Sequence, residues 1–330
     1  MGIRWNLPTE WYGPVRDRMP KEAGIHSLFP KHQHIIEYLG FHVNKPLRMV
    51  RLYTAFAELG DLLSLLMNHS DMRKYVDDQG RPLQAPPIPI VAALYIFEAL
   101  AAGVCLMANG TVPDDKGRWT PPWDHNIIHR DIKAQNYFLS GSTSSGLWPK
   151  LPIAALGDFG NAFDQTDPQY ANTRMDLGTD DWMAPEQLPS APAEHSVTAA
   201  TNVYQIGLVM LQVMLFESPQ YQTDFAAGRQ GPIFLRATNF YPRELVDMAY
   251  SCIAILPEDR PAPLDLYVSI RDLAKSYPED GSSQLPWRKY TWKKDCLGLH
   301  RADIVALLEL QTVPPGQRVR TKVDKWATYV

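Results

Sequence analysis

Residues 128–136 read Ile-His-Arg-Asp-Ile-Lys-Ala-Gln-Asn, and residues 157–160 read Gly-Asp-Phe-Gly. The first run sets an acid, a lysine and an amide at short fixed offsets, and the second run adds an acid next to a glycine. One carboxylate can orient a hydroxyl that attacks a phosphate, while a nearby lysine neutralises the phosphate as it moves. An amide and a second carboxylate can hold Mg²⁺ through hard oxygen ligands. The pattern therefore favours phosphoryl transfer from a metal-bound nucleotide.

The two runs resemble the catalytic loop and the metal-binding triplet of eukaryotic protein kinases, H-R-D-x-K-x-x-N followed by D-F-G. The bland alternative is a solvated polar loop in another α/β protein, and two later motifs argue against it. Residues 178–186 (GTDDWMAPE) resemble the end of a kinase activation segment, and residues 257–261 (PEDRP) resemble the late arginine motif of the family. The resemblance implies an α+β fold with a mostly helical C-terminal lobe and a truncated small β lobe.

The resemblance also implies a role for each matching residue. Asp131 would orient and deprotonate a substrate hydroxyl, and Lys133 would stabilise the phosphate in transfer. Asn136 and Asp158 would hold Mg²⁺ and, through it, ATP. The implied activity is that of a protein serine/threonine kinase, because Lys133 and Thr179 favour Ser/Thr over Tyr substrates in this family. The remaining signature positions are His129, Arg130 and Gly160.

Two further matches concern residues that would brace the fold. Arg260 would pair with Glu186 and so tie the end of the activation segment to the helical lobe. Residues 202–216 are strongly apolar and resemble the central helix of the family, which begins D-V-Y-S-x-G. Asn202 stands where the family has an aspartate whose carboxylate accepts N–H groups of the catalytic loop. Because an amide oxygen accepts without a charge, we expect a weaker anchor.

Residues 47–57 read as a strand that leads into the connection between the two lobes. Counting back from the Gly-Asp pair at residues 60–61 places Thr54 at the gatekeeper position of the resemblance. Ala55, Phe56 and Ala57 would then form the hinge that faces adenine, with Ala55 and Ala57 as the contacting residues. Hinge recognition uses backbone groups, so the identities of these side chains test it poorly.

A helix is predicted to begin at Lys21, with Glu22 in the place of the glutamate of kinase helix αC. Glu22 can equally be a solvated first-turn acid that the helix dipole favours. Residues 1–20 contain three prolines and are expected to be irregular.

The front of the small lobe is the main departure from the family pattern. No G-x-G-x-x-G loop and no V-A-I-K-like strand occur in the sequence. Only 21 residues precede Glu22, whereas the missing strands and hairpin need roughly 35–40. We therefore expect an unpaired sheet edge and an uncovered apolar face. Loss of one preorganised phosphate contact costs on the order of 10²–10³ in rate, so the chain reads as a fragment or a degenerate kinase.

Two other functions remain open. A catalytically silent binding or scaffold module, a pseudokinase, would explain the missing phosphate contacts and Asn202. A small-molecule phosphotransferase with a related lobe would need the loop acid and amide, but not residues 183–186 (Met-Ala-Pro-Glu) or Arg260. The presence of these later motifs argues against it.

The amino-acid composition narrows the classes of binding partner and the cellular compartment that we expect. The net charge of −4 disfavours a nucleic-acid binder that acts through bulk charge. The three cysteines are far apart in sequence, which suggests neither a zinc site nor a disulfide framework and fits a reducing, intracellular compartment, cytoplasmic or nuclear. The expected partner is a protein substrate with Ser or Thr, and the oligomeric state stays open.

Residues 88–108 are apolar except for Glu98 and have the length of a membrane span. An acidic side chain at the centre of a bilayer costs about 2.5–3.5 kcal/mol, so a helix buried in a large lobe is the preferred interpretation. We expect no membrane span.

The resemblance divides the chain into an irregular N-terminus, a partial small lobe, a helical lobe and an extension, at residues 1–20, 21–57, 58–275 and 276–330. Residues 109–126 and 140–150 read as surface insertions, the second as a hairpin extension. The extension would hold a helix near 304–310 and a basic stretch at 318–325. Phosphate on a residue of the activation segment could pair with Arg130, and the candidates are Thr166, Tyr170 and Thr173.

Overall fold

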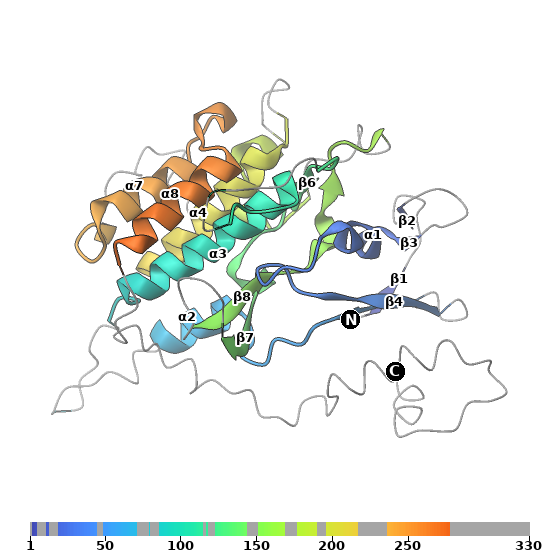
Figure 1. The fold of residues 1–330 in the computed structure, drawn as a ribbon, viewed down its shortest axis with the longest axis horizontal. Helices are drawn as coiled ribbons and strands as arrows, with labels where there is room; N and C mark the ends of the chain where they lie inside the picture. Colours follow the sequence, from blue (N-terminus) through green and yellow to red (C-terminus); the bar gives the residue numbers. More distant parts are fainter. Residues whose placement is uncertain are drawn as a thin grey trace.

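The computed structural model describes residues 2–4, 11–12, 19–44, 49–70, 79, 86–114, 117, 123–143, 151–168, 177–189, 196–216 and 236–277. The helices and strands form a smaller part built on a sheet and a larger, mainly helical part (Figure 1). The smaller part contains β1 (Gly2–Arg4), β2 (Trp11–Tyr12), β3 (Met19–Pro20), α1 (Lys21–Leu28), β4 (Tyr38–Asn44) and β5 (Met49–Thr54). The predicted α+β class is confirmed.

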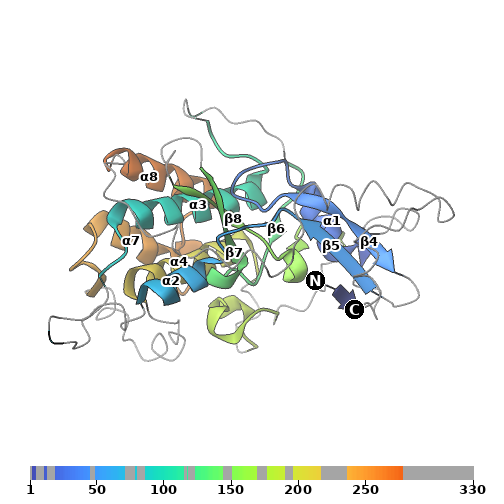
Figure 2. The same ribbon diagram turned by 90° about the horizontal axis from the view of Figure 1, so that it is seen from below.

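The larger part contains α2 (Leu62–Ser70), α3 (Ile90–Asn109), β6 (Ile127–Ile128), β7 (Tyr137–Thr143), β8 (Pro152–Leu156), β9 (Phe163–Asp164), α4 (Ala199–Leu215), α7 (Arg243–Cys252) and α8 (Pro263–Lys275). Five short 3₁₀ helices complete it: η3 (Ala134–Asn136), η4 (Phe159–Asn161), η6 (Asp180–Trp182), η7 (Pro185–Gln187) and η8 (Pro257–Asp259). The β7–β8 hairpin lies between the helices and the small sheet (Figure 2).

The small sheet has the order β1-β5-β4, and both pairings are antiparallel. The prediction that residues 1–20 are irregular is wrong for β1 and for the β2–β3 ladder. Prolines exclude a helix here but do not prevent short extended segments from pairing, and Pro20 sits in a two-stranded ladder where both strands are edges. The edge of β5 that we expected to be open is paired with β1.

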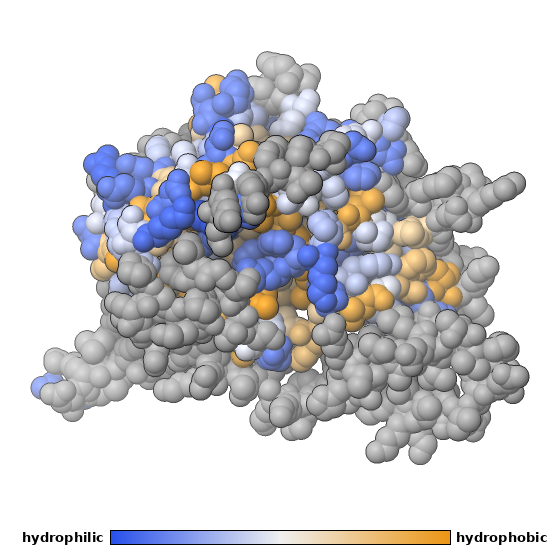
Figure 3. Space-filling model, viewed as in Figure 1, coloured by the Kyte–Doolittle hydropathy of each residue, from blue (hydrophilic) through white to orange (hydrophobic). Residues whose placement is uncertain are grey.

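Helix α1 begins at Lys21, as the sequence predicts, directly after Pro20. Pro20 has φ −52° and ψ 139°, an extended geometry that cannot continue a helix backwards. The side chains of Ala23, Ile25 and His26 are buried. Figure 3 shows hydrophobic residues gathered over the β4 end of this smaller part, whereas hydrophilic residues dominate over α7 and α8.

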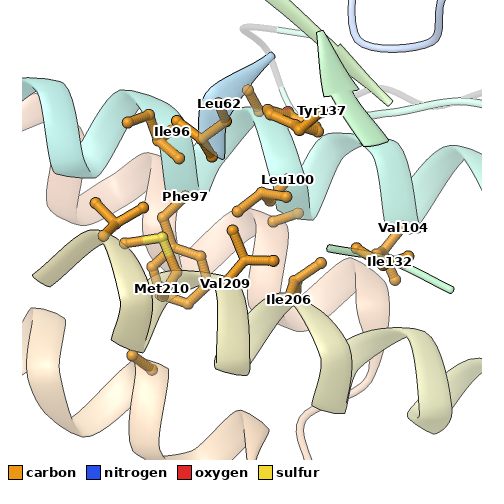
Figure 4. Close-up of a cluster of buried hydrophobic side chains, with 14 of the residues drawn as sticks. Leu62, Ile96, Phe97, Leu100, Val104, Ile132, Tyr137, Ile206, Val209 and Met210 are labelled. Carbon is orange, nitrogen blue, oxygen red and sulfur yellow. The ribbon is translucent and has the colours of Figure 1, made fainter. Parts of the chain in front are cut away.

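The core of the larger part is built around α3 and α4. Helix α3 packs against α4, α8 and β8, and its side chains from Val91 to Met107 are buried, Glu98 among them. Leu100 and Val104 of α3 face Ile206 and Val209 of α4 (Figure 4). Burial of one such side chain contributes about 1.5–3 kcal/mol, so these two helices form a rigid base for the loops above them.

Among the described helices, α3 alone is long and apolar enough to cross a bilayer, and 94% of its most apolar window is buried inside the protein. The structure thus places the predicted helix of residues 88–108 at the centre of the helical part. Its C-terminal cap is Gly110, with φ 68° in the left-handed region, and the connection of residues 109–126 starts there.

Helix α4 starts three residues before the predicted range of 202–216. The Thr198 hydroxyl accepts a hydrogen bond from the N–H of Ala200, and the Thr201 hydroxyl accepts one from the N–H of Thr198. These caps extend the helix into a stretch without apolar periodicity, which is why the apolar pattern missed it.

Part of the insertion at 140–150 is a hairpin ladder, because β7 reaches Thr143 and pairs with Pro152 of β8. The hairpin is bonded to the connection between the two parts: the N–H of Leu59 donates to the carbonyl of Leu139, and the N–H of Leu139 donates to that of Gly60. The tip of the insertion, the predicted helix near 304–310 and the basic stretch at 318–325 lie outside the described residues.

Candidate active site

The loop of residues 129–133 runs from β6 to η3 over the start of α4. The side chain of Asn202 accepts the N–H of His129 (2.9 Å) and donates to the carbonyl of Ile127 (2.9 Å). Gln205 accepts the N–H of Ile132 (3.1 Å) and donates to the carbonyl of Arg130 (2.9 Å). Two buried amides, one turn apart on α4, therefore hold the loop backbone from both ends.

Asn202 thus anchors the catalytic loop as the resemblance implies, and its nitrogen adds a bond that a carboxylate cannot make. Gln205 was missed in the sequence. Its signal was its position three residues after Asn202, since residues at i and i+3 share one face of a helix. Arg130 has φ 68°, a left-handed conformation that is costly for a residue with a side chain, so the bonds to its carbonyl hold an unfavourable backbone shape.

Asp131, Lys133 and Thr179 form a closed set of hydrogen bonds. Lys133 Nζ donates to Asp131 Oδ2 (2.9 Å) and to Thr179 Oγ1 (2.7 Å), and the Thr179 hydroxyl donates to Asp131 Oδ1 (2.7 Å). Asp131 is 7% exposed, and the Lys133 side chain is 17% exposed. A carboxylate and an ammonium group are therefore held together at fixed positions with limited access to water, where their charges act more strongly than in bulk solvent.

Asn136 and Asp158 lie beside this set. Asn136 Nδ2 donates to the carbonyl of Asp131 (2.9 Å), and the carbonyl of Asn136 accepts the N–H of Gly157 (3.0 Å). These two bonds bring the catalytic loop and the residue before Asp158 into contact. Asn136 is therefore bonded both to the backbone of Asp131 and to the backbone of the residue before Asp158.

The donor set suits Mg²⁺. Asp158 is exposed, and neither its carboxylate nor Asn136 Oδ1 takes part in a hydrogen bond or ion pair within the described part of the chain. No cluster of three or more His, Cys, Asp or Glu side chains suited to a metal occurs among those residues. One carboxylate and one amide fit an ion that takes its other ligands from phosphate and water.

Glu22 of α1 points toward Asp158. A Cβ atom placed on Gly160 would lie 3.4 Å from Asp158 Oδ1 and 3.7 Å from Glu22 Oε2, so the two carboxylates flank the same glycine. Burial, and then the charge of Asp158, raise the pKa of Glu22 to about 7. Glu22 makes no ion pair within the described ranges. Glu22 is thus both a first-turn acid of α1 and a residue of the site.

Four rings form a continuous row of tilted ring contacts beside these carboxylates, and the sequence did not predict it. The ring centroids of Tyr38 and His26 are 5.4 Å apart, those of His26 and Phe159 are 4.9 Å apart, and those of Phe159 and His129 are 5.0 Å apart. Desolvation lowers the pKa of His26 to about 4, so this ring is neutral at pH 7. This row of rings joins β4, α1, the residue after Asp158 and the catalytic loop.

Thr54 ends β5, and Ala55 to Ala57 form the connection to the helical part. The N–H of Ala55 donates to the carbonyl of Glu37, and the carbonyl of Ala57 accepts the N–H of Gly60. The N–H of Ala57 makes no hydrogen bond with any described residue. The proposed adenine contact at Ala57 therefore has a free donor.

Arg130 is fully buried beside the segment that follows Asp158. Its guanidinium donates to the carbonyl of Asn161 and lies 4.8 Å from the centroid of the Phe163 ring. The Thr166 hydroxyl is bonded to Asp164 Oδ1 (2.8 Å) and to the carbonyl of Asp124 (3.1 Å). Tyr170 and Thr173 lie outside the described residues.

Comparison with known proteins agrees with this geometry. Residues 123–267 match the family described as "Protein kinase domain". The G2-specific protein kinase nimA of Emericella nidulans is 24% identical over 255 residues, 74% of this chain and 33% of the relative. The G2-specific protein kinase fin1 of Schizosaccharomyces pombe is 25% identical over 193 residues, 57% of this chain and 23% of the relative.

The serine/threonine-protein kinase Nek5 of Mus musculus is 29% identical over 155 residues, 43% of this chain and 21% of the relative. The matches thus span no more than about a third of the length of these relatives. The matched range holds the catalytic loop, Asp158, Glu186 and Arg260. Together with the arrangement of the loop, these matches support a member of the protein kinase family, and the family match covers residues 123–267, less than half of the chain.

Proposed function

We propose that the chain is a protein serine/threonine kinase that transfers the γ-phosphate of ATP to a hydroxyl of a protein substrate. The observation that carries this proposal is the set of hydrogen bonds joining Asp131, Lys133 and Thr179. It holds a proton acceptor and a cation in one rigid geometry before any substrate arrives, and such preorganisation is what phosphoryl transfer requires.

Asp131 would accept the proton of the substrate hydroxyl and orient its oxygen toward the phosphate. Lys133 would balance the negative charge that gathers on the phosphate during transfer, from its position 2.9 Å from Asp131 Oδ2. Asn136 Oδ1 and Asp158 would hold Mg²⁺, which neutralises charge on the nucleotide phosphates when bound. Ala55 and Ala57 would receive the adenine ring through backbone groups.

The names of the relatives support Ser/Thr substrates, since Nek5 is named a serine/threonine-protein kinase. In this chain the Thr179 hydroxyl also bonds to both Lys133 and Asp131. We further propose an intracellular location, supported by the free thiols Cys105 and Cys252, both buried and unpaired within the described ranges.

A catalytically silent binding module is the second candidate, and one observation favours it. Glu22 faces Asp158 without an ion pair in the described part of the chain, and burial together with the charge of Asp158 raises the pKa of Glu22. A site in this state binds nucleotide weakly unless a cation enters it.

The test is transfer of radiolabelled phosphate from Mg·ATP to a Ser/Thr protein substrate, measured together with nucleotide calorimetry. The kinase proposal expects Asp131→Asn to lower the transfer rate by roughly 10³-fold or more, with little change in nucleotide affinity. Asp265→Asn, an exposed acid on α8, is the matched control and should transfer as the wild type does. A folded wild-type protein that binds nucleotide but transfers nothing would leave the binding module as the better function.

A further inference from the structure

Trp123, near the end of the 109–126 connection, packs against the C-terminal end of α3. Its indole N–H donates to the carbonyl of Met107 (3.3 Å). A Cβ atom on Gly110 would lie 2.3 Å from Trp123 Cε3, so this ring fits only because residue 110 is glycine. The φ of 68° at Gly110 has the same requirement. The backbone at the end of α3 is therefore shaped to receive this one ring.

The other side of the Trp123 ring meets α1. It stacks on Phe29, the residue that follows α1, with ring centroids 6.2 Å apart and an interplanar angle of 24°. Phe29 in turn contacts Phe159, the neighbour of Asp158, with centroids 4.9 Å apart. The chain of rings Trp123–Phe29–Phe159 thus runs from the helical core to the residue beside the proposed metal ligand.

The residues after Trp123 reach the segment that follows Asp158. His125 makes a ring contact with Trp123 (5.0 Å) and a hydrogen bond with Asp164 (Nδ1 to Oδ2, 2.5 Å). Asp164 is 1% exposed and also accepts the N–H of Asn126 (3.1 Å). Residues 123–126 therefore contact both α1, through Phe29, and the start of the activation segment, through Asp164.

We propose that Trp123 is a positioning residue for Asp158, and this rests on the proposed kinase function. It fixes the end of α1 to the helical part, and with it Phe29, Phe159 and the backbone of Asp158, the residue before Phe159. In this chain Glu22 makes no ion pair within the described residues, so Glu22 does not tie α1 to the rest of the site through a salt bridge. The aromatic contact supplied by the 109–126 connection takes the place of such a tie.

The experiment compares Trp123→Ala with Trp123→Phe, which keeps a ring over Phe29 but loses the indole N–H. Two readouts are used: hydrogen exchange of peptides covering 21–29 and 157–164, and steady-state phosphate transfer. We expect Trp123→Ala to increase exchange in both peptides and to lower kcat by roughly 10- to 100-fold, with the KM for protein substrate little changed. Trp123→Phe should retain most of the wild-type protection from exchange in both peptides and most of the wild-type kcat. Phe29→Ala should reproduce the effect, and the double variant should be no worse than either single one.

Leu245→Ala is the matched control, because Leu245 is fully buried in α7, away from these rings. At a temperature where all variants stay folded, Leu245→Ala should leave the hydrogen exchange of both peptides and kcat unchanged. Trp123→Leu serves where the alanine variant does not fold. The proposal is overturned if exchange rises evenly over the whole chain, or if Leu245→Ala lowers kcat as much as Trp123→Ala. A wild-type protein without transfer activity would refute the kinase function alone, since the exchange readout decides the role of Trp123 by itself.

Discussion

The carboxylate of Glu186 receives both terminal nitrogens of Arg260, at 2.6 Å and 2.8 Å, and neither side chain is exposed to solvent. Arg260 also donates to the carbonyls of Ala254, Ala200 and Ile255. The Thr201 hydroxyl donates to Glu186 Oε1 (2.7 Å). This pair joins the end of the activation segment to α4 and to the turn before α8, as the sequence motifs predicted.

Removal of Arg260 should destabilise the protein strongly. Arg260→Ala leaves the buried Glu186 carboxylate with only the Thr201 hydroxyl, so we expect a loss of about 3–5 kcal/mol in the free energy of unfolding, measured by urea denaturation. Arg243→Ala is the control, because Arg243 pairs with Asp247 on the surface (3.3 Å) and should cost at most about 1 kcal/mol. Equal losses for the two variants would contradict the buried-pair explanation.

Restoring the family's aspartate at position 202 should weaken this protein. Asn202→Asp keeps the bond to the His129 N–H but places a carboxylate oxygen against the Ile127 carbonyl, both buried. We expect a loss of about 1–3 kcal/mol in the free energy of unfolding at neutral pH. The loss should shrink in acid, where a protonated carboxyl can donate to that carbonyl. A more stable variant at neutral pH would show that the amide nitrogen contributes nothing.

The hydroxyl of Thr179 should matter more than its methyl group. Thr179→Ala removes the donor to Asp131 and the acceptor for Lys133, each part of a charge-assisted bond worth about 1.5–3 kcal/mol. We expect kcat for phosphate transfer to fall by roughly 10- to 100-fold with an unchanged KM for ATP. Thr179→Ser keeps the hydroxyl and should stay close to the wild-type rate. Similar losses in the two variants would assign the effect to packing instead.

Acid should destabilise the protein through His34. Its Nδ1 is bonded to the carbonyl of Ala154 (2.9 Å), and burial lowers its pKa to about 3. The unfolded chain binds a proton at this residue below about pH 6.5, whereas the folded chain does not, so stability falls as the pH decreases.

From about pH 7.5 to about pH 5, His34 alone should remove about 2 kcal/mol from the free energy of unfolding. The His34→Asn variant, whose amide can still donate to the Ala154 carbonyl, should be less stable overall. Its free energy of unfolding should fall by about 2 kcal/mol less than that of the wild type over this pH range. An unchanged pH slope in this variant would assign the acid sensitivity to other groups, such as His26 or His32, whose pKa values burial also lowers.

Much of the fold followed from local signals. The apolar run at 88–108 predicted α3, the proline before Lys21 predicted the start of α1, and the motif spacing predicted the partnership of Glu186 with Arg260. The prediction of an irregular N-terminus was wrong where β1 and the β2–β3 ladder form. Pairing of such short strands depends on which strand edges are free in the folded protein, and no local sequence pattern records that.

The sequence by itself determined the identity and order of the proposed reactive groups, since Asp131, Lys133, Asn136 and Asp158 stand at the spacing of the kinase motifs that they resemble. Only the tertiary structure decided that Glu22 faces Asp158 without an ion pair in the described residues, and that Trp123 reaches α1 through Phe29. The physical reason is range. Backbone periodicity and caps act over a few residues, whereas contacts between residues a hundred positions apart depend on how the helices and the sheet pack together.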